Sequence, residues 1–110
     1  MAFKLVARNA VLVPVRGTIT DETGKAERFD FTLTCRRLPA TELAQTLKST
    51  ERTVYDFLAD VIEGWTGVLD ADGHPVPCTP DNIAALLDQP GVGVLAYKAY
   101  LEEHGAKEKN

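Results

Sequence analysis

Apolar and polar residues alternate along the first third of the chain, which is the pattern of a strand with one buried face. From Val11 to Ile19, Val, Gly or Ile stands at every odd position, and the even positions are more polar. Pro14 lies within this run and has no N–H to donate to a neighbouring strand. We therefore predict a strand that lies at a sheet edge or carries a bulge.

A second alternating run covers residues 28–36, and DETGK at 21–25 is a turn signal between the two runs. Its apolar face consists of Phe29, Phe31, Leu33 and Cys35. The two runs predict an antiparallel hairpin. Phe3, Leu5 and Ala7 also alternate, and they suggest a short additional strand before the hairpin.

The apolar period then changes from two to that of a helix. Residues 39–49 predict a short, weakly amphipathic helix. From Glu51 to Trp65, apolar residues recur at i, i+3, i+4, i+7, i+8 and i+11, namely at Val54, Phe57, Leu58, Val61, Ile62 and Trp65. We predict one unbroken helix over this stretch.

Residues 67–77 read as a connector rich in turns, with Asp72-Gly73 at the tip of a small hairpin. The helix that follows has a well-defined start. Thr79 is a suitable N-cap, Pro80 suits the first helical position, and Asp81 complements the helix dipole. We predict a third helix that ends at Gln89-Pro90-Gly91.

The last predicted helix, from Val92 to His104, is apolar on two faces. One stripe contains Val92, Leu95, Ala96 and Ala99 and is widened by Tyr100, and the other contains Val94, Tyr97 and Leu101. Such a helix is buried on both sides, or it packs on something outside its own domain. Both alternatives stay open. We select Tyr97, Tyr100 and Leu101 as candidates for partner binding or an oligomer interface. Trp65 is a weaker candidate, with core packing as its alternative.

Together these elements predict one α+β domain over residues 1–104 and a polar tail over 105–110. The fold class is an N-terminal antiparallel hairpin or small sheet of two to four strands, packed against three or four helices. A length of 110 residues, with 45% hydrophobic and 25% charged residues, suits one globular domain. No apolar run approaches the roughly 20 residues of a membrane span, and the first residues lack the features of a signal peptide. We expect a soluble cytoplasmic protein.

The net charge of −4 is unevenly distributed. Residues 1–55 hold nine Lys/Arg and six Asp/Glu, a net of +3, whereas residues 56–110 hold three and ten, a net of −7. An acidic total argues against non-specific nucleic-acid binding, which needs a cationic surface. The asymmetry could steer head-to-tail self-association or a charged partner, or it could reflect two ordinary solvated surfaces.

Two motifs resemble ligand sites but lack the context that such sites need. Residues 91–96, GVGVLA, match a dinucleotide fingerprint, but Pro90 precedes them where a strand is required. Asp70-Ala71-Asp72-Gly73 resembles the start of a calcium loop, but Pro75 stands at the sixth position, where the loop needs Gly. Turn formation explains both segments.

Groups for catalysis or for metal binding are few. The prolines between His74 and Cys78 prevent a helix that would place both on one face. Ser49 is the only serine and has no flanking glycines. Cys35 alternates onto the buried face of its strand, where a thiol is usually inert. We expect no enzyme activity, no metal and no cofactor, and we expect free, reduced cysteines.

Short motifs spread over residues 29–101 resemble those of the tail assembly chaperones of tailed phages. They are Arg37-Leu38 after the hairpin, Trp65-Thr66-Gly67-Val68, the turn Asp72-Gly73, Val76-Pro77-Cys78-Thr79 at a helix start, and the break Pro90-Gly91. Cys78 stands where that family usually has an aromatic residue.

This resemblance implies a non-catalytic phage or prophage protein in the cytoplasm of the bacterial host. Members of that family bind the tape measure protein, keep it soluble, help to recruit tail tube subunits, tend to self-associate and are absent from the finished virion. From the charge and the lack of a long apolar run, we expect no nucleic-acid and no membrane partner. A structural tail or head component, such as a connector or completion protein, is the first alternative. A small enzyme or inhibitor and a nucleic-acid-binding regulator are weaker ones.

Overall fold

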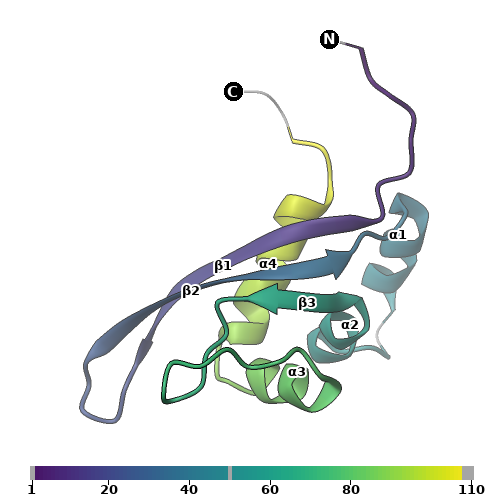
Figure 1. Ribbon diagram of the computed structural model, residues 1–110. Coiled ribbons are helices and arrows are strands. Elements are labelled where there is room, and N and C mark those ends of the chain that lie inside the picture. The colour runs from purple at the N-terminus through teal and green to yellow at the C-terminus, as the bar shows by residue number, and fades with distance from the viewer. Residues whose placement is uncertain (1, 50, 108–110) are drawn as a thin grey trace.

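The computed structural model describes residues 2–49 and 51–107, and it contains a three-stranded antiparallel sheet and four helices (Figure 1). Strands β1 and β2 form the hairpin, and β3 lies next to β2, so the sheet order is β1-β2-β3. The elements are β1 (Ala10–Thr20), β2 (Ala26–Arg36), α1 (Ala40–Lys48), α2 (Val54–Val61), β3 (Ile62–Thr66), α3 (Pro80–Leu87) and α4 (Val92–His104). The predicted α+β class is confirmed.

The hairpin has the register that the two alternating patterns require. Val15 pairs with Phe31, and pairing continues in step from Ala10 to Thr20. At the tip, the Asp21 carboxylate accepts hydrogen bonds from the backbone N–H groups of Thr23 and Lys25. Strand β1 lies at the sheet edge, which confirms the prediction from Pro14. The tip projects beyond the helices (Figure 1).

The core lies between the inner face of the sheet and the helices. Val13, Val15, Leu33 and Cys35 on the strands are all but fully buried. Helix α4 packs along β1, and α2 and α3 pack against α4 and against each other. The helices contribute Leu58, Val61, Ala96 and Tyr100, which are as deeply buried as the strand residues. The outer face of the sheet carries polar residues such as Arg16, Thr32 and Thr34.

The single helix predicted over residues 51–65 is wrong in its second half. Helix α2 ends at Val61, and the chain continues directly into β3. Ile62 pairs with Cys35 and Trp65 with Leu33, with a register shift between these pairs. The extra residue in this bulge lets side chains three positions apart share one face of a strand, a spacing that otherwise indicates a helix. Pairing with β2 overrides the local pattern.

The additional strand predicted at Phe3, Leu5 and Ala7 is also wrong. Residues 2–9 form neither helix nor strand, and β3 supplies the third strand instead. Alternation is not sufficient because an apolar face needs a surface to pack against, and the side chains of residues 2–9 are all exposed. At the other end, residues 105–107 of the predicted polar tail have no regular structure, and 108–110 lie outside the described residues.

The remaining elements agree with the sequence predictions. The Thr79 side chain caps α3 by accepting a hydrogen bond from the Asn82 N–H at 3.2 Å. A single bridge between Leu69 and Pro75 closes the small hairpin in the connector. Gly91, with φ of 82°, turns the chain into α4. No helix in the described part of the chain has both the length and the apolar character to cross a membrane.

Candidate partner-binding surface

Tyr100, one of the candidate interface residues, lies in the core of the chain itself. Its side chain is 0% exposed, and its ring packs edge-on against Phe57 with the ring centroids 5.2 Å apart. The hydroxyl donates a hydrogen bond to the Arg36 carbonyl oxygen at 2.9 Å, and burial raises the pKa of Tyr100. Tyr100 therefore fixes α4 to the end of β2 and presents no surface to a partner.

Trp65 is half-buried and has a structural contact of its own. Its indole N–H donates to the carbonyl oxygen of Val76 at 2.7 Å, across eleven residues of chain. Its ring packs against the core. This bond holds the 67–77 connector against β3, so the contact agrees with the core alternative for Trp65.

Tyr97 and Leu101 lie on the opposite side of α4 from the sheet. Tyr97 is half-buried and packs edge-on against Phe57, with ring centroids 5.7 Å apart. Leu101 is 37% exposed and follows Tyr97 by one helical turn. Val94, which is 50% exposed, precedes Tyr97 on the same stripe. These three residues are the outer row of α4.

Two residues from other helices extend the outer row. Tyr55 of α2 is exposed, and its ring carbon Cε1 lies 3.0 Å from the position that a Cβ would take at Gly93. Leu47 of α1 is exposed and lines, with Tyr97, a hollow of about 90 Å³ between α1 and α4. We call this surface the α4 face: Leu47, Tyr55, Val94, Tyr97 and Leu101.

Sequence reasoning did not select Leu47, Tyr55 or Val94 as contact residues. Tyr55 has a signal in hindsight, because it stands just outside the apolar stripe of its own helix and must therefore point away from the core. Leu47 belongs to a helix with a weak amphipathic pattern, and no residue of α1 is fully buried.

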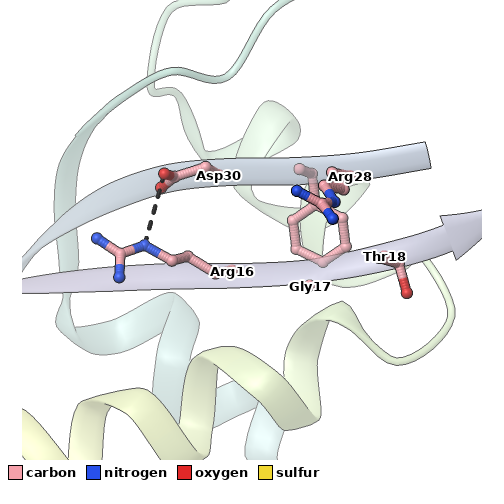
Figure 2. A pocket seen from close by; sticks show the side chains of 6 residues that line it. Arg16, Gly17, Thr18, Arg28 and Asp30 are labelled. Atoms are coloured by element: carbon pink, nitrogen blue, oxygen red, sulfur yellow. Dashed lines mark ion pairs between the residues drawn. The ribbon is translucent and has the colours of Figure 1, made fainter.

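The polar hollows of the described chain are shallow and open to solvent. One of them lies on the hairpin and is lined by Arg16, Thr18, Arg28 and Asp30 among others. Figure 2 shows Arg16 and Asp30 facing one another across the two strands, with 3.5 Å between Nε and Oδ2. Both side chains are largely exposed, so solvent screens this ion pair.

Asp70, Asp72 and His74 also come together, with one potential ligand atom from each within 4.8 Å of the others. The Asp70 carboxylate accepts hydrogen bonds from the backbone N–H groups of Asp72 and His74. All three residues are exposed. These bonds shape the tip of the small hairpin, in agreement with the turn interpretation.

Both cysteines are free thiols. Burial raises the pKa of Cys35 to about 12 and raises the pKa of the half-buried Cys78. A thiol reacts as its thiolate, so Cys35 is unreactive near neutral pH. The arrangement fits a residue that fills the core beside Leu33.

Comparison with known proteins identifies a family. The family model for the YdaY prophage protein matches residues 24–103, which is most of the chain and extends from the hairpin tip to the end of α4. No curated protein and no solved structure matches the chain.

Proposed function

We propose that this chain, which belongs to the YdaY prophage protein family, is a tail assembly chaperone that binds the tape measure protein and keeps it soluble. A prophage carries the genes of a phage particle, and an assembly role suits a small domain encoded among such genes. The tail tube protein would then be recruited to this complex.

The observation that carries the proposal is the α4 face. A tape measure protein is a long helix with an apolar surface, and such a helix is bound by an apolar groove or face. Val94, Tyr97 and Leu101 supply a stripe that runs along α4, with Tyr55 next to Gly93 and Leu47 next to Tyr97. The hollow between Leu47 and Tyr97, which Thr46, Ser49, Arg52 and Thr53 also line, gives an incoming side chain a place to enter.

The charges around this surface suit the same role. The second half of the chain has a net charge of −7, and Glu102 and Glu103 follow Leu101 directly. A strong net charge opposes aggregation when apolar surface is exposed. An acidic chaperone can therefore present the α4 face while it remains dispersed.

The test is co-expression of the tagged chain with the tape measure protein of the same prophage, followed by affinity capture. We expect the wild-type chain to recover tape measure protein from the soluble fraction. The double variant Val94→Asp with Leu101→Lys should recover at least about tenfold less tape measure protein. Each new charge is the one favoured at its end of a helix, so α4 itself is retained. Leu12→Asp is the matched control, since Leu12 is 63% exposed on the outer face of the sheet.

Two outcomes would contradict the proposal. In one, the wild-type chain recovers no tape measure protein and is found instead in purified phage particles, which favours a structural tail or head component. In the other, the double variant recovers as much tape measure protein as the Leu12→Asp control, which removes the α4 face from the interaction.

A further inference from the structure

A second apolar surface lies beneath the projecting part of the β1–β2 hairpin. It is a groove of about 210 Å³, which we call the hairpin groove. Its walls come from the hairpin, the connector after β3, the end of α3 and the start of α4. The apolar lining residues are Ile19, Phe29, Phe31, Val68, Leu69, Leu86 and Val92.

The N-terminal arm, residues 2–9, carries the apolar side chains that could fill this groove. Leu5 is 94% exposed, and Phe3 and Val6 are also largely exposed. The arm has a local shape, because the Arg8 guanidinium lies over the Phe3 ring at 4.9 Å and donates to the carbonyl oxygens of Val6 and Lys4. The arm is therefore a locally ordered segment whose apolar side chains are exposed and pack on little else in their own chain.

The two surfaces have opposite charge. Residues 2–9 include Lys4 and Arg8 and no acidic residue. Beside the hairpin groove, Asp70 follows the lining residue Leu69, and Asp72 lies close to Asp70. The arm belongs to the half of the chain with net positive charge, and the acidic residues beside the groove belong to the half with net negative charge. The two surfaces are therefore electrostatically complementary.

The arm cannot reach the far end of the groove in its own chain. Its base is fixed, because the Arg37 N–H donates to the Asn9 carbonyl oxygen at 2.9 Å. Ile19 stands ten residues further along β1, which is roughly 33 Å at the rise of a strand. Phe3 is six residues from Asn9, which spans at most about 22 Å when fully extended. Figure 1 shows the N-terminal segment and the hairpin tip at opposite ends of the molecule.

We infer that the N-terminal arm of one copy docks into the hairpin groove of a second copy. The contact joins two different surfaces, so every copy in a row keeps a free arm at one end and a free groove at the other. Such a head-to-tail contact builds open chains or closed rings, and the smallest ring is a dimer in which both arms are exchanged. The contact is small and is therefore expected to be weak and dependent on concentration.

The experiment measures molar mass by light scattering and by sedimentation, at chain concentrations up to about 0.5 mM, because a weak contact populates only in this range. Wild-type chain should form dimers and larger species as concentration rises. Leu5→Asp and Leu69→Asp should each be monomeric, because docking would bury the new carboxylate. Leu12→Asp, on neither surface, should associate like the wild type.

Mixing the two variants gives the sharpest result. A Leu5→Asp copy keeps its groove, and a Leu69→Asp copy keeps its arm, so one intact contact is possible between them. An equimolar mixture should form dimers and nothing larger, which also shows that both variants are folded. The inference is overturned by a wild-type chain that stays monomeric, by either variant associating like the wild type, or by a mixture that stays monomeric.

This inference is independent of the proposed function, and the two fail separately. Self-association is read from mass in the absence of any tape measure protein, whereas chaperone activity is read from recovered tape measure protein. If the wild-type chain stays monomeric and Leu69→Asp instead loses tape measure protein, the groove holds that partner and the inference is wrong.

Discussion

Helix α4 carries two rows of apolar residues that differ in their surroundings more than in their chemistry. The inner row contains Val92, Ala96 and Tyr100, none of which is more than 6% exposed. The outer row contains Val94, Tyr97 and Leu101, of which two are exposed and one is half-buried. Each row has a tyrosine and two aliphatic residues. Residue type alone therefore does not separate buried from exposed positions on this helix.

The difference between the rows comes from the elements that they face. The inner row faces β1 and β2, and Tyr100 closes the contact by its hydrogen bond to Arg36. In the outer row, Tyr97 lies beside Leu47 of α1, a helix that buries none of its residues. A short helix covers the outer row only in part, and a partner helix could complete the cover.

Truncating the inner row should give the largest change in stability. Tyr100→Ala removes a fully buried ring, and we expect it to lower the free energy of unfolding by about 3–5 kcal/mol. Tyr100→Phe keeps the ring but leaves the Arg36 carbonyl without its hydrogen-bond donor. We expect it to lower the free energy of unfolding by about 1 kcal/mol. Urea denaturation followed by circular dichroism measures both. A Tyr100→Ala chain as stable as the wild type would show that the inner row is not the core.

The buried thiol of Cys35 lies beside the inner row, and it should lower the free energy of unfolding as the pH rises in the alkaline range. In the unfolded chain a cysteine has a pKa of roughly 8.5, whereas burial raises the pKa of Cys35 to about 12. Between these values the folded chain holds a proton that the unfolded chain has released, so stability falls as pH rises. The slope is about 1.4 kcal/mol per pH unit.

Denaturation at pH 9.0 and 10.5 measures this effect. We expect Cys35→Ala to lose less stability over the interval than the wild type, although its stability at neutral pH is lower. Cys78→Ala is the control, because Cys78 is half-buried and its thiolate is better solvated. Equal pH slopes for the wild type and Cys35→Ala would contradict the proposed burial of this thiol.

Changing the outer row should have the smallest effect on stability. We expect Val94→Asp to change the free energy of unfolding by no more than about 0.5 kcal/mol, because the side chain is exposed and the new charge lies in the first turn of α4. The same denaturation experiment measures it. A loss as large as that of Tyr100→Ala would place the outer row in the core and remove the contrast between the rows.

The sequence predicts the elements whose patterns are strictly local. The hairpin register follows from two alternating runs and a turn between them, and α3 follows from the cap at Thr79. The start of α2 could also have been found, since Thr53 and Asp56 form a reciprocal capping pair three residues apart. That pair places the first helical residue at Val54 rather than at Glu51.

The errors have one cause, which is contact between residues far apart in the chain. Trp65 continues the helical stripe of α2, and only its pairing with Leu33 shows that it belongs to a strand. Tyr100 and Tyr97 have similar local patterns, and only the sheet distinguishes them. The pattern of α4 therefore did not show that Tyr100 faces the core while Tyr97 lies towards the outside.

Hydrogen exchange measured on the free chain and on its complex with the tape measure protein tests the central proposal most directly. The proposal predicts slower amide exchange in α4 and in α1, because bound partner opposes local opening of these helices, and no change at the hairpin tip, residues 21–25. Protection confined to the hairpin, with α4 exchanging as in the free chain, would contradict the assignment of the α4 face.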